Sequence, residues 1–112
     1  MKNENSMNIP LYWVDAFTET PFRGNAAAVC ILKKPLNAQV MQKIAAEMGI
    51  SETAFICSTE RKPLKQVKNF SLRWFTPKVE VKLCGHATLA AAAVLFHEIN
   101  VLADEVFFET KS

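Results

Sequence analysis

Hydrophobic and polar residues alternate in several short stretches of the 112-residue chain, and this alternation predicts β-strands. It is clearest over residues 9–17, where successive side chains would point to opposite faces of a sheet. An almost wholly apolar run over residues 26–32 predicts a second strand with both faces buried. The same reasoning predicts further strands over residues 52–58, 70–75, 79–83 and 106–110.

Two other stretches have helical character. After Asn37, a residue suited to cap a helix, apolar residues recur along one stripe until Gly49, which supplies a left-handed stop; the stripe comprises Val40, Met41, Ile44, Ala45 and Met48. Residues 87–98 are rich in strong helix formers and apolar on every side, so we expect a helix that is buried on all faces. A curved sheet around this helix, with the amphipathic helix packed outside, would be an α+β fold.

Composition limits the classes of protein that the chain could represent. Half of its residues are hydrophobic, which suffices for one domain with a modest core, expected over residues 9–112. Residues 1–8 are polar and lack the hydrophobic core of a signal peptide, so they are expected to form a disordered extension. The net charge of +2 is too small to indicate a nucleic-acid partner. The longest apolar run, about ten residues, is too short for a membrane span.

Cysteine usage and the missing cofactor motifs narrow the choice further. The three cysteines, Cys30, Cys57 and Cys84, show neither a disulfide framework nor zinc-ligand spacing, and this fits a reducing, cytoplasmic location. No phosphate-binding loop or nucleotide fingerprint occurs, so we expect no cofactor. Glu80, Cys84 and His86 match the spacing of no common metal site, so no metal is expected either.

The triplet Cys84-Gly85-His86 directly precedes the apolar helix. The first turn of a helix presents unpaired N–H groups and partial positive charge, and a glycine there allows a ligand to approach the backbone. These residues therefore predict a pocket for a small carboxylic acid. The alternative is a simple turn and cap, with Cys84 as a small buried hydrophobic residue. His97, near the other end of the helix, is expected to face solvent or to interact with the helix dipole.

Glu52 is the leading candidate for acid–base chemistry. It opens an otherwise apolar strand, where partial burial would disfavour the charged carboxylate. A carboxyl group in that setting is suited to taking up and returning a proton. The alternative is an ordinary solvated acid at a strand edge. Asp15 and Asn25, polar residues in apolar surroundings, either line a pocket or cap their own turns.

Four motifs together resemble a known family. The run from Phe75-Thr-Pro77 through Glu80-Val81 to Leu83-Cys-Gly-His-Ala-Thr-Leu-Ala90 is similar to the signature of the PhzF family of phenazine biosynthesis-like isomerases. Three more stretches agree in order and spacing: Asp15-Ala-Phe-Thr18, Phe22-Arg-Gly-Asn-Ala-Ala-Ala-Val29 and Ser51-Glu-Thr-Ala-Phe55. The resemblance covers nearly everything from Ile9 to Thr110. Ala26 departs from it, because the family usually has a proline there.

The resemblance implies a fold and an activity. The fold is a half-barrel like that of diaminopimelate epimerase, a curved and mostly antiparallel sheet around one helix. The family uses this half-barrel twice per chain, and the present sequence holds only the first lobe. The implied activity is that of a cofactor-independent isomerase, which moves a proton on a small unsaturated or cyclic carboxylic acid. The family prototype acts on a dihydro-hydroxyanthranilate, but substrate identity does not carry over.

The resemblance also implies roles for individual residues. Glu52 matches the catalytic glutamate, and His86 would hold the substrate and assist the proton transfer. Residues expected to contact the substrate are Ser51, Gly85, Asn25, Asp15 and Cys84. Related epimerases carry a catalytic thiol at the position of Cys84, but their second thiol comes from the lobe that this chain lacks, which favours a structural Cys84.

A second hypothesis is that the chain is a truncated, non-catalytic single lobe that binds a protein partner, or merely a fragment. Without its second lobe it would expose apolar surface, and such surface favours association. We therefore expect a homodimer, in which the second copy partly imitates the missing lobe.

Overall fold

The computed structural model describes residues 9–16 and 25–111. The predicted extension at residues 1–8 lies outside these residues, as does residue 17, the last residue of the first predicted strand. The described elements are β1 (Leu11–Ala16), β2 (Asn25–Leu32), α1 (Ala38–Met48), β3 (Glu52–Ser58), a 3₁₀ turn (Leu64–Gln66), β4 (Asn69–Phe75), β5 (Glu80–Val81), α2 (Gly85–Ala93), a π-helical turn (Val94–Glu98) and β6 (Phe107–Glu109).

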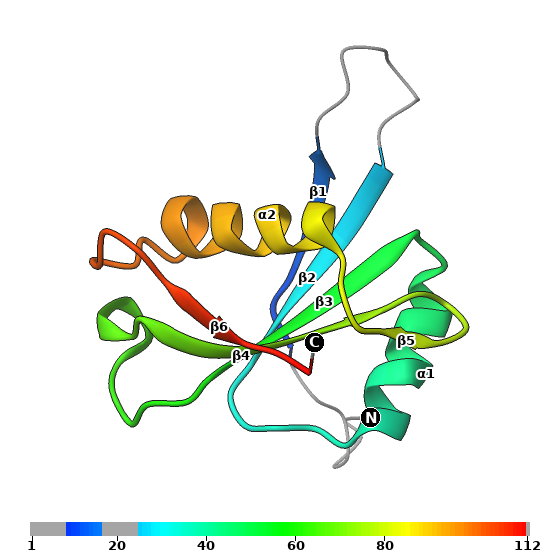
Figure 1. The fold of residues 1–112 in the computed structure, drawn as a ribbon, viewed down its shortest axis with the longest axis horizontal. Helices are drawn as coiled ribbons and strands as arrows, with labels where there is room; N and C mark the ends of the chain where they lie inside the picture. The colour runs from blue at the N-terminus through cyan, green and yellow to red at the C-terminus, as the bar shows by residue number, and fades with distance from the viewer. Residues whose placement is uncertain (1–8, 17–24, 112) are drawn as a thin grey trace, which may run out of the picture.

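The strands form one mixed sheet in the order β1-β2-β3-β4-β5, with β6 pairing with β4 (Figure 1). Antiparallel pairs join β1 to β2, β3 to β4 and β4 to β5, whereas β2 and β3 are parallel and are connected through α1. Strand β6 runs parallel to the first half of β4. Within the described residues the sheet does not close into a barrel, and β1 forms one of its edges. The predicted α+β class is confirmed.

The two helices cover opposite faces of the sheet, because alternate strand residues belong to two separate cores (Figure 1). On the α1 face, Met41 and Ala45 pack with Phe55, Cys57 and Phe75. The rings of Phe55 and Phe75 meet edge to face with centroids 5.5 Å apart, a favoured aromatic geometry. The α2 face holds the larger core, and its buried members are mostly small or aliphatic: Ala27, Val29, Ile31, Ala54, Ile56, Val67, Phe70, Leu72, Trp74, Ala87, Ala90, Ala91, Val94, Leu95 and Val101.

Helix α1 confirms the capping prediction at both ends. The side-chain oxygen of Asn37 accepts a hydrogen bond of 2.9 Å from the backbone N–H of Val40. This bond satisfies one of the N–H groups that a helix start leaves unpaired. At the other end Gly49 adopts φ 66°, a left-handed conformation that suits glycine, and its N–H bonds the carbonyl of Ala45.

Helix α2 corrects the prediction of burial on all faces. Ala87, Ala90 and Ala91 lie against the sheet, but Leu89 on the other side is 55% exposed. The prediction is wrong because the open sheet covers only one side of the helix. The expected helix over residues 87–98 also begins two residues earlier, at Gly85, and its last turn is π-helical, with the N–H of Ile99 bonded to the carbonyl of Val94 at 3.0 Å.

The connections follow the sequence pattern with one difference. Strand β4 ends at Phe75, before Thr76-Pro77, as predicted. The strand expected over residues 79–83 is only two residues long, because Val79 belongs to the turn, where its N–H bonds the Thr76 hydroxyl at 3.0 Å. The loop between β3 and β4 is mostly exposed and contains the 3₁₀ turn.

The Glu60 side chain holds this loop. Its Oε2 accepts hydrogen bonds from the backbone N–H groups of Lys68 at 2.9 Å and Asn69 at 2.8 Å, and its Oε1 lies 3.0 Å from the Lys62 ammonium. The Lys68 hydrogen bond, followed by the contacts with Lys62 and Asn69, lowers the pKa of Glu60 from 4.5 to about 2. The ionised carboxylate therefore stabilises the folded loop.

We predict that Glu60→Gln destabilises the protein at neutral pH but not in strong acid. The folded-state pKa lies below the unfolded one, so the stabilisation is complete above pH 4.5 and disappears as the pH falls towards about 2. Urea unfolding followed by circular dichroism across this range measures the difference, with the exposed Glu105→Gln as control. A difference between Glu60→Gln and wild type that does not change with pH would contradict the prediction.

Candidate functional site

Glu52 and His86 lie together where β3 begins and α2 begins. Glu52 is the first residue of β3, beside Ala27 of β2, and His86 is in the first turn of α2. The Nε2 atom of His86 is 3.7 Å from Oε1 of Glu52. The structure therefore brings together the two residues that the sequence proposes for acid–base chemistry.

Both side chains are largely, but not completely, shielded from solvent. Glu52 is 23% exposed and His86 is 20% exposed. The Nε2 atom of His86 is itself buried and has no hydrogen-bond partner among the described residues. A separation of 3.7 Å is longer than a hydrogen bond, and catalytic contacts are often this loose before a substrate is bound. The His86 Nε2 and the Glu52 carboxylate could therefore both form hydrogen bonds with a bound ligand.

Cys84 adjoins the pair at the N-cap of α2. Burial raises the pKa of its thiol, the nearby N–H groups of Ala87 and His86 oppose this, and the charge of Glu52 raises it further. The raised pKa keeps Cys84 protonated at neutral pH, and only the thiolate form of cysteine is nucleophilic. Cys84 is therefore suited to packing rather than to nucleophilic catalysis.

Gly85 leaves this N-terminus open. Among the described residues, a side-chain carbon added at Gly85 would meet nothing within 4 Å, so these residues leave the space beside the first turn unfilled. Its backbone does not have the positive φ found at Gly49, and glycine is therefore not required here for conformation. What the glycine provides is access to the unpaired N–H groups of the helix start.

The remaining predicted site residues are placed less completely. Ser51 is exposed and adjoins Glu52 in the chain. Asp15 and Asn25 are residues of β1 and β2 at the end of the sheet where β3 begins, but their side chains lie outside the described part of the chain.

Glu80, considered above as a metal ligand, instead pairs with Arg73 through two contacts of 2.7 Å, and Arg73 lowers the pKa of Glu80. Among the described residues no three His, Cys, Asp or Glu side chains gather as a metal site.

Sequence reasoning missed two residues next to the site. The indole Nε1 of Trp74 donates a hydrogen bond of 3.0 Å to Oγ1 of Thr88. The Thr88 hydroxyl in turn donates one of 2.8 Å to the carbonyl oxygen of Cys84. The available signal was Thr88 itself, the lone hydroxyl in the apolar run that follows His86.

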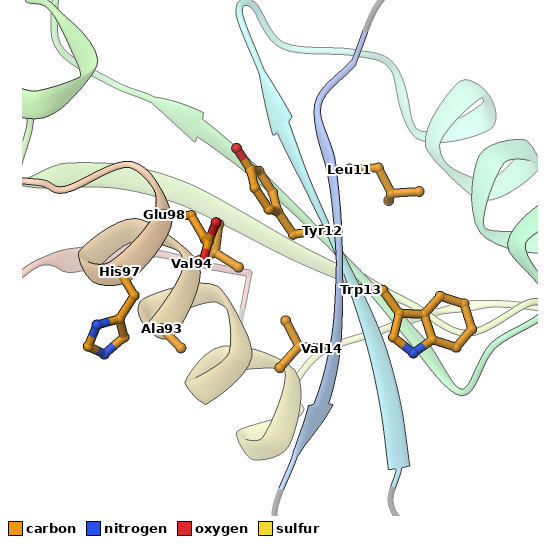
Figure 2. A pocket seen from close by; sticks show the side chains of 8 residues that line it. All are labelled: Leu11, Tyr12, Trp13, Val14, Ala93, Val94, His97 and Glu98. Atoms are coloured by element: carbon orange, nitrogen blue, oxygen red, sulfur yellow. The ribbon is translucent and has the colours of Figure 1, made fainter.

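A groove of about 420 Å³ lies away from this site, between β1 and the far part of the α2 segment. Figure 2 shows Tyr12 and Val14 of β1 pointing towards Ala93 and Val94, with His97 at the rim. His97 is exposed, in agreement with its predicted role.

No helix in the part of the chain that the structure describes combines the length and apolar character needed to cross a bilayer.

Comparison with known proteins gives one consistent result. The family profile described as "Phenazine biosynthesis-like protein" (PhzC-PhzF) matches residues 14–112. The chain is 52% identical over 107 residues to the mouse phenazine biosynthesis-like domain-containing protein 1, covering 95% of this chain and 37% of that protein. It is 45% identical over 106 residues to an uncharacterized isomerase of Pseudomonas aeruginosa, covering 95% of this chain and 38% of that protein. The chain therefore spans less than half the length of these curated relatives.

Solved structures agree with the sequence matches. The structure of a PhzF-family phenazine biosynthesis protein from Enterococcus faecalis matches with a TM-score of 0.77 and 49% identity, covering 91% of this chain and 36% of that chain. A predicted epimerase from Pseudomonas aeruginosa matches with a TM-score of 0.67 and 31% identity, covering 81% of this chain and 30% of that chain. The fold is thus the one that the resemblance implied.

We predict that Cys84 is alkylated more slowly by iodoacetamide at neutral pH than a free cysteine, because its raised pKa reduces the thiolate population. Glu52→Gln removes a charge that raises this pKa, so it should increase the rate, by at most about tenfold. Mass spectrometry of the labelled peptide measures both rates. Glu47→Gln, an exposed carboxylate on α1, is the matched control, and equal rates in the two variants would show that the Glu52 charge does not reach the thiol.

Proposed function

Because the chain belongs to the PhzC/PhzF phenazine biosynthesis-like family, we propose that it forms the acid–base half of an isomerase site for small unsaturated or cyclic carboxylic acids. The observation that carries the proposal is the 3.7 Å approach of Glu52 and His86 beside the open N-terminus of α2. The isomerase name of a relative at 45% identity supports the reaction class.

The geometry suggests how substrate and proton would be handled. A substrate carboxylate is attracted to the open start of α2, where N–H groups and the helix dipole favour an anion. This places the carbon skeleton beside Glu52. Glu52 then takes a proton from a carbon next to the unsaturated system, the C–H electrons move into that system, and Glu52 returns the proton to another carbon. No electrons are gained or lost overall, so the step requires no redox cofactor.

His86 and Cys84 have supporting roles in this proposal. The Nε2 of His86, which has no hydrogen-bond partner among the described residues, can hydrogen-bond the substrate or the Glu52 carboxyl, and this bond would hold both for the proton transfer. Cys84 packs under the helix start as a neutral thiol. Ser51, Asp15 and Asn25 are proposed to complete the polar wall at the same end of the sheet.

We predict that Glu52→Gln abolishes proton exchange while the fold is retained. The wild-type chain, incubated in D₂O with a panel of small unsaturated acids, should incorporate deuterium into one of them or move its double bond, as observed by proton NMR. Loss of the acid–base group should slow this by about 10²–10⁴-fold.

Glu47→Gln serves as the control for Glu52→Gln, because it makes the same chemical change at an exposed position of α1. Circular dichroism verifies that each variant is folded. Exchange at the wild-type rate in Glu52→Gln would exclude Glu52 as the base. No exchange with any acid in the wild-type chain would contradict activity of this lobe by itself.

A second proposal concerns the exposed side of α2. Gly85 and Leu89 are four residues apart and therefore lie on one face of the helix. Leu89 is 55% exposed, and Leu83, two residues before Gly85, is 74% exposed. Apolar surface of this kind marks interaction sites, and we propose that a second copy of the chain covers it as a symmetric dimer.

Light scattering should therefore give twice the 12.5 kDa mass of one chain, and Leu89→Glu should shift the equilibrium towards the monomer because it buries a charge in the interface. Leu102→Glu is the control, since Leu102 is also exposed but lies in the segment bonded to Lys65. A wild-type monomer, or equal dissociation of both variants, would contradict this interface.

A further inference from the structure

A short hydrogen-bond chain crosses the otherwise apolar contact between α2 and the sheet. Trp74, which is almost completely buried on β4, donates its indole N–H to Oγ1 of Thr88 at 3.0 Å. The Thr88 hydroxyl donates to the Cys84 carbonyl at 2.8 Å, and that carbonyl also accepts the backbone N–H of Thr88 at 3.0 Å. The first turn of α2 is thereby bonded to a strand at one defined point.

The rest of the contact between α2 and the sheet is made by small apolar side chains, which do little to fix the orientation of the helix. The residues that α2 buries are Ala87, Ala90 and Ala91, and they share one core with alanines of the sheet such as Ala27 and Ala54. Small side chains allow a close approach but interdigitate weakly, so they fix the start of the helix less firmly than the buried Val94 and Leu95 fix its continuation. A hydrogen bond depends on distance and angle and therefore resists a shift of the helix start.

This link joins α2, which carries His86, to β4, the strand that pairs with the Glu52 strand β3. Trp74 pairs with Ala54, which is two residues after Glu52 on β3. Thr88 is two residues after His86 on α2. The Nε2 of His86 has no hydrogen-bond partner among the described residues, so no bond of that nitrogen fixes its position relative to Glu52. The position of His86 depends instead on where the first turn is held.

We propose that Thr88, held by Trp74, is a positioning residue that sets the separation between Glu52 and His86. Its catalytic significance rests on the proposed function, but the geometric claim does not. The hydroxyl touches no substrate in this proposal. It acts by fixing the helix start that carries His86.

The experiment compares Thr88→Val, which removes the hydroxyl, with Thr88→Ser, which keeps it. Thr53→Val is the matched control, because the Thr53 hydroxyl is buried without a hydrogen-bond partner in the described structure and belongs to β3 next to Glu52. The first readout is the nuclear Overhauser effect between the His86 ring and the Glu52 side chain in the labelled chain. This readout needs neither substrate nor activity.

We expect the Overhauser effect in wild type, Thr88→Ser and Thr53→Val, and its loss in Thr88→Val. The second readout is the affinity for benzoate, a stable probe acid, measured from NMR shifts. Thr88→Val should weaken it by about tenfold, in the range for a lost hydrogen bond, and Thr88→Ser should restore it. In a His86→Ala background the same Thr88→Val change should have no further effect, because Thr88 acts through His86.

The proposal is overturned if folded Thr88→Val keeps the Overhauser effect, or if its loss of affinity is the same with and without His86. If Thr88→Val does not fold, Trp74→Phe removes the donor and is judged by the same two readouts. If wild-type protein shows the Overhauser effect but does not bind benzoate, the carboxylate site of the proposed function is contradicted, and the Overhauser comparison alone decides the role of Thr88.

Discussion

The close approach of α2 to the sheet is the constraint on which the site depends. Ala87, Ala90 and Ala91 on the helix and Ala27 and Ala54 on the strands are all buried. These small side chains allow the helix backbone to lie near the sheet, so that the residue before Ala87 reaches the residue at the start of β3. A larger side chain at any of these positions would lift the helix and separate His86 from Glu52.

The two faces of the sheet therefore contribute differently, one mainly to stability and the other to the candidate site. On the α1 face, large side chains such as Met41, Phe55 and Phe75 fill the core, and α1 has a cap at each end. On the α2 face, the described residues leave the N-terminus of the helix open and give Nε2 of His86 no hydrogen-bond partner, and both features are unfavourable for stability. We infer that the packing of the two cores offsets the cost of keeping the start of α2 available for a ligand.

The sequence predicted most elements, because short strands with alternating residues and a capped amphipathic helix are determined locally. Strand β3 and helix α1 fall where the pattern placed them. The exposed side of α2 was not predicted, because an all-apolar helix indicates burial without saying which part of the protein supplies the cover. The two-residue β5 differs for a similar reason: the Thr76 hydroxyl binds the backbone of Val79 and keeps it in the turn.

The candidate site was predictable only in part. Glu52 and His86 were each recognisable, but their contact joins separate elements and followed from family resemblance rather than from local pattern. Trp74 and Thr88 could not be paired from sequence, because their hydrogen bond depends on the register of β4 against β3 and on the rotation of α2. Tertiary geometry of this kind is not encoded in any single stretch.

The open helix start and the exposed apolar side of α2 are parts of one surface. Gly85 and Leu89 share a helix face, and Leu83, two residues before Gly85, is also highly exposed. In the dimer proposed above, a second copy that covers Leu83 and Leu89 would also lie over the space beside Gly85 and would reduce the access of water to Glu52 and His86. Proton transfer to carbon benefits from such exclusion of water, because electrostatic interactions strengthen in a drier site. Association through this surface and completion of the site would then be the same event.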